Sequence, residues 1–352
     1  TMLGDATEIS DTVIGMAPDA TGIGCRNMTR GIGTPASYTA CFEFFLAPYP
    51  QGGNPMTDGK PELAPNIINN SWGCPPSEGC DIVSLRQIVE TVRAAGIFVV
   101  ASAGNNGNIC GSVRDPIAIH DATFTIGAHA SSGNIASFSS IGPVTIDNIN
   151  RRKPDIAAPG VDVRSAGLAD GVNTFLQGTS MASPHVAGAV ALLWSAVPTL
   201  TGNIDLTEQV LLKSATPATF TQACGVLGVG AWPNNIFGFG RLDALAAVTL
   251  AQQPATVHAT IKLESGAPLP NAQVQLRDNA TDYLLTGTSD ENGAVIFSPV
   301  YGSSSSARYT LNVLGAPEQF TPLIADVAEG EMTTLLVRSN QRTFLPLVMT
   351  SK

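Results

Sequence analysis

Short apolar segments alternate with longer segments of helical periodicity along the first two thirds of the chain. Residues 97–103 (Ile-Phe-Val-Val-Ala-Ser-Ala) are almost continuously apolar, and residues 123–128 form a similar run. Strands that are apolar on both faces belong to parallel sheets whose two sides are covered by helices. The intervening segments of helical spacing would supply that cover. The sequence therefore predicts a three-layer α/β/α domain built on a parallel sheet.

This pattern also predicts individual elements. We expect strands at residues 20–28, 66–71, 97–103 and 123–128, and helices at residues 35–46, 81–95, 180–194, 206–215 and 242–250. Asp81 is the expected N-cap of its helix and Gly96 the residue that ends it. The helix at 180–194 consists of small and apolar residues, which indicates that it is buried on all sides.

The periodicity changes after Gln252-Gln253-Pro254. From Ala255 onward apolar residues recur at every second position, and five further short strands with turn signals follow. Alternation with period two over several short segments is typical of a small all-β sandwich. We therefore expect three parts: a domain at 1–252, a β-sandwich at 255–340 and a tail at 341–352.

Composition excludes several classes of protein. Charged residues make up only 13% of the chain and hydrophobic residues 44%, which argues against disorder. The formal net charge of −10 disfavours nucleic-acid and anionic-membrane partners. No apolar run is long enough to span a membrane. Residue 1 is neither an initiator Met nor the start of a signal peptide, so we expect it to be a processing point or the edge of a fragment.

Six cysteines allow fifteen pairings, and the sequence does not choose among them. Cys74 and Cys80 bracket a turn-rich loop that a local disulfide would hold. Six buried free thiols are the alternative. No metal-type cluster accompanies the cysteines, which favours disulfides and an exported protein.

The strongest chemical signal is Gly-Thr-Ser-Met-Ala-Ser-Pro-His-Val-Ala-Gly at residues 178–188. It places Ser180 at the start of the buried helix, where free backbone N–H groups would stabilise negative charge developing on a nearby carbonyl oxygen. A serine alone in this place would be an ordinary helix cap. A second motif, Val-Val-Ala-Ser-Ala-Gly-Asn-Asn-Gly at residues 99–107, ends a buried strand in a polar loop with Asn105.

The two motifs resemble those of the subtilisin-like serine proteases, the subtilase family, and residues 24–28 (Gly-Cys-Arg-Asn-Met) resemble its bacillopeptidase F branch. The resemblance covers residues 1–252 and implies that Ser180 is the nucleophile and Asn105 an oxyanion-hole donor. It also implies that the substrate cleft has two walls, made of Ser71, Trp72 and Gly73 and of Ser102, Ala103 and Gly104. Trp72 suggests an apolar or aromatic preference at the cleavage residue.

The chain departs from the family pattern in one respect. Subtilases carry their catalytic Asp and His before the region of Asn105, and residues 1–4 (Thr-Met-Leu-Gly) resemble the end of the His motif with the His cut away. We therefore expect a domain that lacks its N-terminal strands and is inactive alone. His185 is expected to be a packing residue, His120 and His129 exposed loop residues, and His258 a residue of the second domain, so no general base is assigned.

Residues 266–276 and 288–297 resemble a carboxypeptidase-regulatory-like (transthyretin-like) sandwich, which implies an accessory module. Together these features predict a secreted, monomeric serine endopeptidase acting on protein or peptide substrates. Its chemistry requires no cofactor, and no metal ligands are assigned, although subtilases often bind structural calcium. Two alternatives stay open. A pseudoprotease would keep the cleft for peptide binding, and a sedolisin-type peptidase would carry Asp in the place of Asn105.

Overall fold

The computed structural model describes residues 1–6, 12–146, 148–167, 173–222, 224–225, 228–302 and 307–340. The chain divides into two compact units, Thr1–Val248 and Thr249–Lys352. The tail expected at 341–352 lies outside the described residues.

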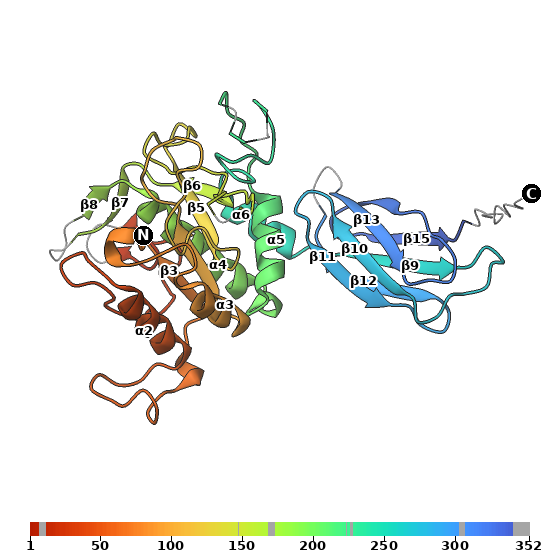
Figure 1. Cartoon of the computed structure of the whole chain (residues 1–352), viewed down its shortest axis with the longest axis horizontal. Helices are drawn as coiled ribbons and strands as arrows, with labels where there is room; N and C mark the ends of the chain where they lie inside the picture. Colours follow the sequence, from red (N-terminus) through yellow and green to blue (C-terminus); the bar gives the residue numbers. More distant parts are fainter. Residues whose placement is uncertain are drawn as a thin grey trace, which may run out of the picture. The chain divides into compact units, whose positions relative to one another are not determined.

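A parallel sheet of four strands forms the centre of the first unit (Figure 1). Its strands, in spatial order, are β3 (Ile67–Asn70), β4 (Phe98–Ser102), β5 (Phe124–His129) and β6 (Ile156–Pro159). Every residue of β4 is buried, as the continuous apolar run predicted. A strand buried on both faces requires a layer of helices on each side.

Side chains of β4 alternate between the two helical layers. Val99 and Ala101 join the hydrophobic cluster that contains the buried residues of α3 (Arg86–Ala94). Phe98 meets Trp194 of α4 (Thr179–Ala196) edge to face, with ring centroids 6.3 Å apart. Helix α4 contacts all four strands of the sheet, and α2 (Pro35–Leu46) packs beside α3. The first unit is therefore a three-layer α/β/α domain, which confirms the predicted fold class.

The remaining elements of this unit lie around the sheet. They are the strand pairs β1 (Asp5–Ala6) with β2 (Thr12–Val13) and β7 (Val163–Ala166) with β8 (Asn173–Leu176), the 3₁₀ turns η1 (Pro61–Leu63), η2 (Pro76–Glu78) and η3 (Pro198–Leu200), and the helix α5 (Ile204–Ser214). The helix α6 (Ala244–Ala251) runs across the division between the two units.

Two elements of the structure differ from the sequence-based prediction. The helix expected from residue 81 begins at Arg86, because the Asp81 side chain accepts hydrogen bonds from the backbone of a preceding turn and Leu85 adopts a positive φ of 65°. Residues 20–28, expected as a strand, are irregular. A strand needs a neighbour for its backbone groups, and none of the described strands pairs with this segment.

Three disulfides join all six cysteines. The pairs are Cys25–Cys41, Cys74–Cys80 and Cys110–Cys224. The Cys74–Cys80 pair is the local disulfide that the turn-rich loop between these cysteines indicated. The third spans 114 residues and could not be chosen from the sequence, because it depends on which loops meet in the fold.

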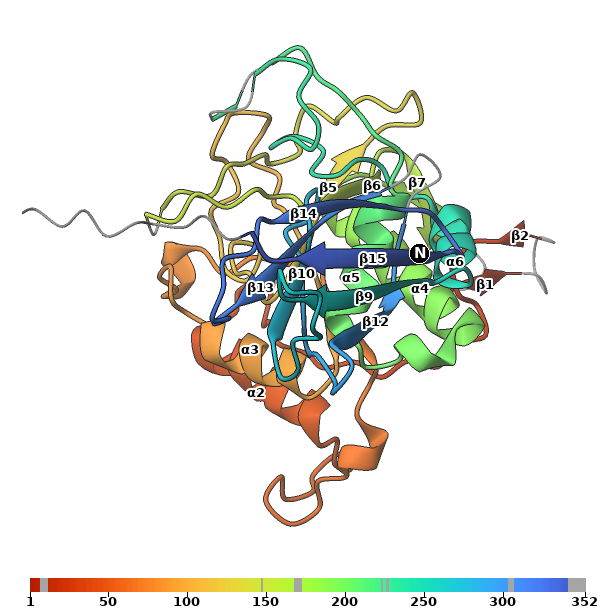
Figure 2. The ribbon, with the colours of Figure 1, turned by 90° about the vertical axis from the view of Figure 1, so that its right-hand side faces the viewer.

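The second unit contains two β-sheets. One has the order β11 (Leu284–Thr288), β10 (Gln273–Asp278), β13 (Ala307–Leu314) and β14 (Leu323–Val327). The other has the order β12 (Ala294–Val300), β9 (Ala255–Lys262) and β15 (Met332–Arg338). Figure 2 labels β14, which Figure 1 does not, together with five of the other strands. Alternate residues of β9 are buried, as the period of two predicted. The sequence reading missed β14, although its exposed Ile324 and Asp326 alternate with the buried Ala325 and Val327.

The prediction that His120 and His129 are exposed loop residues is wrong for both. His129 is the last residue of β5 and is half-buried, and His120 is buried, with 2% of its surface exposed. Its Nε2 lies 2.9 Å from the carbonyl oxygen of Ser84, and its Nδ1 is buried without a hydrogen-bond partner among the described residues. An Nε2–H that donates to Ser84 leaves Nδ1 unprotonated, and a proton added there would be buried without an acceptor. Burial therefore lowers the pKa of His120 below its ordinary value.

This environment predicts a pH-dependent stability. The unfolded chain binds a proton at His120 near pH 6.5 and the folded chain does so only at lower pH, so the free energy of unfolding should fall as pH drops below about 6.5. Each such histidine contributes a slope of at most about 1.4 kcal/mol per pH unit. Denaturant unfolding of wild type and His120→Gln between pH 7 and 5 should give a shallower dependence in the variant. Equal slopes would show that the pKa of His120 is the same in the folded and the unfolded chain.

Candidate active site

The segments singled out in the sequence meet at one edge of the sheet. Strands β3 and β4 are parallel neighbours, with Asn70 opposite Ala101, so both end at the same edge. Ser71 follows β3, Asn105 follows β4, and α4 begins with Thr179 beside them. The carboxyl edge of a parallel sheet is where α/β proteins commonly bind ligands.

Ser180 is the second residue of α4 and is half-buried. Its Oγ donates to the carbonyl oxygen of Ser71 over 3.2 Å, and the Ser71 hydroxyl donates to the carbonyl oxygen of Ser180 over 2.8 Å. Gly178 precedes the helix with φ 150° and ψ 159°, a region that residues with a side chain rarely occupy. This backbone conformation starts the helix sharply and places Ser180 at its N-terminal end.

Asn105 is fixed by the start of the same helix. Its Oδ1 accepts hydrogen bonds from the backbone N–H of Thr179 at 2.9 Å and from the Thr179 hydroxyl at 3.0 Å. These contacts fix which end of the amide faces the helix, because only the oxygen can accept. The Nδ2 group of this exposed side chain has no hydrogen-bond partner in the described part of the chain. An oriented amide donor thus lies beside the N–H groups of a helix N-terminus.

Thr179 is a site residue that the sequence reading did not single out. Its hydroxyl donates to Asn105 and accepts from the backbone N–H of Gly104 at 3.2 Å. The side chain is fully buried, so these contacts are sheltered from water. The only signal in the sequence was its place between Gly178 and Ser180 within the motif.

The two predicted cleft walls lie side by side, because they continue β3 and β4. Gly104 has a positive φ of 102°, and a Cβ there would lie 3.0 Å from Ser140 Oγ, so the second wall turns where a side chain would not fit. The indole of Trp72 stacks on the ring of Tyr38, with centroids 4.0 Å apart and planes inclined by 11°. Trp72 therefore packs against α2, while its backbone continues from β3 in the predicted first wall.

None of the four histidines makes a hydrogen bond to Ser180. Nδ1 of His185 lies 2.8 Å from the Met181 carbonyl oxygen within α4, and Nδ1 of His129 lies 2.8 Å from the Ala130 carbonyl oxygen. His120 contacts Ser84, and His258 belongs to the second unit. Burial lowers the pKa of His129 and His185 below the ordinary value. The described residues therefore provide Ser180 with a backbone acceptor and no imidazole base.

The described part of the chain contains no group of three or more His, Cys, Asp or Glu side chains arranged to hold a metal ion. None of its helices combines the length and apolar character needed to cross a membrane.

Comparison with known proteins agrees with these features. Residues 6–240 match the model of the subtilase family. The chain is 37% identical over 243 residues to bacillopeptidase F of Bacillus subtilis (strain 168), covering 67% of this chain and 15% of that protein. It is 42% identical over 141 residues to subtilisin DY of Bacillus licheniformis, covering 39% of this chain and 46% of that one. The chain thus spans less than half the length of these two relatives.

A solved structure shares the fold. The patellamide maturation protease PatA superposes with a TM-score of 0.53 and 27% sequence identity, covering 71% of this chain and 80% of that chain. The family match extends over more than half of the chain and includes both motifs at the carboxyl edge of the sheet. This chain belongs to the subtilase family.

Proposed function

We propose that this chain carries the nucleophile and the oxyanion-binding donors of a serine endopeptidase that cleaves peptide bonds of proteins. The observation that carries the proposal is the anchoring of Asn105 by Thr179, next to Ser180. Both donors that an oxyanion needs are then held at the N-terminus of α4: the Ser180 backbone N–H belongs to the helix, and the Asn105 amide is anchored to its first residue. Sequence similarity to bacillopeptidase F and subtilisin DY supports the same reaction.

The reaction begins when Ser180 Oγ attacks the carbonyl carbon of the scissile bond and its proton passes to a general base. The carbonyl oxygen becomes negatively charged, and the Asn105 amide and the helix N-terminus stabilise it. The C–N bond then breaks as the amine takes the proton, which leaves an acyl group on Ser180. Water removes this group by the reverse series of steps.

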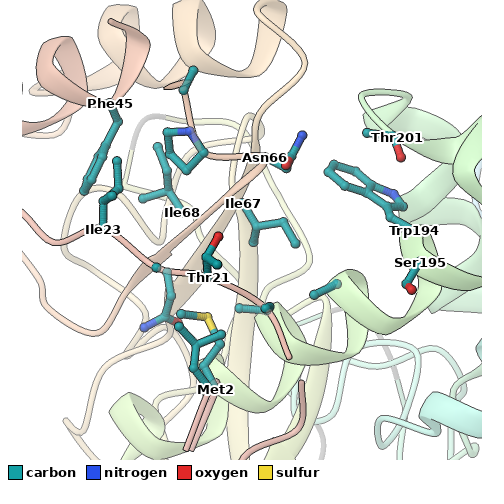
Figure 3. A pocket seen from close by; sticks show the side chains of 18 of the residues that line it. Met2, Thr21, Ile23, Phe45, Asn66, Ile67, Ile68, Trp194, Ser195 and Thr201 are labelled. Atoms are coloured by element: carbon teal, nitrogen blue, oxygen red, sulfur yellow. The ribbon is translucent and has the colours of Figure 1, made fainter. Parts of the chain in front are cut away.

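We propose that the general base comes from a segment of the protein that does not belong to the residues described here. A pocket of about 700 Å³ lies along the free edge of β3 and is lined by residues 20–23, residues 67–69 and Ala187, Ala191 and Trp194 of α4 (Figure 3). Asn69 lines it, and its Oδ1 is buried without a hydrogen-bond partner among the described residues. A further parallel strand in this pocket would pair with β3 and supply a donor to Asn69.

Such a strand would also reach the candidate site. Nδ2 of Asn69 donates to Ser71 Oγ at 3.0 Å, and Ser71 contacts Ser180. We propose that the Asp and His of the family motif are carried by a segment upstream of Thr1 that fills this pocket, and that the chain without this segment is inactive. Hydrolysis of a protein such as casein, by the chain alone and by the chain extended upstream, tests the proposal. Hydrolysis by the chain alone would contradict it, and peptide binding without hydrolysis by the extended protein would favour the pseudoprotease.

Substitution of Asn105 tests the oxyanion role. In the extended protein, Asn105→Ala should lower kcat by about 10²–10³-fold, the effect of removing the corresponding donor in subtilisin. Asn105→Asp keeps an oxygen for Thr179 but removes the donor, so it should lower kcat as well. The neighbouring Asn106→Ala serves as the control and should change kcat only a few-fold. A normal kcat in Asn105→Ala would remove Asn105 from the mechanism.

We further propose that the protein is secreted and acts as a monomer, with the second unit as an accessory module. The three disulfides support secretion, because they persist in oxidising compartments.

A further inference from the structure

The segment that follows Asn105 returns to the opposite wall of the candidate cleft. It leaves the second wall at Gly104 and reaches the first wall at residues 115–116, where the Cys74 N–H donates to the Pro116 carbonyl oxygen at 2.9 Å. A Cβ placed on Gly73 would lie 3.2 Å from Asp115 Cβ and 3.5 Å from Asp115 Oδ2. The Asp115 carboxyl therefore lies against Gly73, where the loop from the second wall meets the first.

The contacts around this segment hold it in place. The Ser112 hydroxyl donates to the Gly107 carbonyl oxygen at 2.7 Å, and the backbone N–H of Ile141 donates to the same hydroxyl at 2.9 Å. The disulfides Cys110–Cys224 and Cys74–Cys80 tie the two adjoining loops. Asp115 thus belongs to a cross-linked frame and not to an unsupported loop.

The Asp115 carboxyl has no hydrogen bond or ion pair within the described residues, although it is half-buried. Arg114 donates through Nε to the Gly111 carbonyl oxygen instead. The carboxylate of Glu78 is occupied by the Tyr38 hydroxyl at 2.6 Å and the Gly33 N–H at 3.1 Å. Burial raises the pKa of Asp115, the positive charge of the neighbouring Arg114 opposes this effect with a smaller contribution, and the negative charge of Glu78 adds to it. A carboxylate that is partly removed from water and accepts no hydrogen bond is costly, and a hydrogen-bonding cation from a ligand would relieve that cost.

We propose that Asp115 is a specificity-determining residue that selects a lysine or arginine side chain on the acyl side of the scissile bond. This inference rests on the proposed endopeptidase function. Gly73 has no side chain to separate the bound residue from the carboxylate, and a charge-assisted hydrogen bond would pair the two. The net charge of −10 favours the approach of basic substrates. The assignment differs from the apolar preference suggested by Trp72, whose indole is packed on Tyr38.

The test compares substrates that differ at one position. Fluorogenic peptides with Lys, Leu or Glu before the scissile bond and identical flanking residues are assayed with the upstream-extended protein. Wild type should prefer Lys over Leu, and Asp115→Asn should lower kcat/KM for the Lys peptide by about 10- to 100-fold, the range for loss of a hydrogen bond between charged groups. The same variant should hydrolyse the Leu peptide within about three-fold of wild type.

Control variants separate this role from a general effect of charge or folding. Glu90→Gln removes one negative charge from an exposed position on α3 and should leave the Lys-to-Leu ratio unchanged. Asp115→Glu should keep the Lys preference, and Asp115→Lys should reverse it in favour of the Glu peptide. Hydrolysis with the same ratio in wild type and Asp115→Asn would overturn this inference alone. If the wild type hydrolyses none of the peptides and does not react with a fluorophosphonate, the proposed function is overturned with it.

Discussion

Replacing Ser180 with alanine in the upstream-extended protein is expected to lower peptide turnover by about 10⁶-fold, the magnitude known for loss of the serine in subtilisin. The reason is that the acyl-enzyme route disappears, while the Asn105 donor and the helix N-terminus remain. A fluorophosphonate probe should label wild-type Ser180 in the extended protein, and this label should be absent from Ser180→Ala. Labelling is measured by mass spectrometry of the modified peptide.

Two further proteins serve as controls for the labelling of Ser180 by the fluorophosphonate. Ser183→Ala removes a neighbouring hydroxyl, which lies 3.0 Å from Ser71 Oγ, and should retain the label on Ser180. The chain starting at Thr1 should remain unlabelled, because no imidazole contacts Ser180. Labelling of that chain would mean that one of its own residues activates Ser180, and the upstream origin of the base would then be wrong. Equal turnover by Ser180→Ala and wild type would exclude Ser180 as the nucleophile.

Removal of the Cys110–Cys224 disulfide is expected to produce the largest loss of stability. The bridge closes a loop of 114 residues, and the chain-entropy relation gives about 5 kcal/mol for a loop of that length. Cys224 is also buried in a cluster with Ile141, Ile236 and Phe237. The double variant Cys110→Ala/Cys224→Ala should therefore lower the free energy of unfolding by up to this amount.

Cys74→Ala/Cys80→Ala provides a matched comparison. The two cysteines of this pair have a sequence separation of 6, and the same relation predicts a loss of about 2 kcal/mol in the free energy of unfolding. Both variants are measured by denaturant unfolding followed through tryptophan fluorescence, since Trp72, Trp194 and Trp232 all belong to the first unit. A smaller loss for the long loop than for the short loop would contradict the entropic explanation.

Local sequence determined most of the secondary structure. The continuous apolar run at 97–103 became β4, the run of small and apolar residues became α4, and the alternation from Ala255 became β9. Residues 20–28 show the limit of this reasoning. Their composition suits a strand, but a strand forms only where another strand accepts its hydrogen bonds. Asp81 shows a second limit, because its side chain stabilises a turn as readily as a helix start.

The two motifs identified Ser180 and Asn105 because their residue types and spacing are specific to the subtilase family. Nothing in either motif placed them in contact, since they lie on segments separated by more than 70 residues. The tertiary structure joins them through Thr179, which is 74 residues from Asn105. It also paired the cysteines and placed Asp115 against Gly73. The residues with the relevant chemistry can be identified from the primary structure, because backbone preference and motif spacing are local properties. Which of these residues meet follows from the three-dimensional fold, because their contacts depend on the order of strands in the sheet and on the course of the loops that leave its edge.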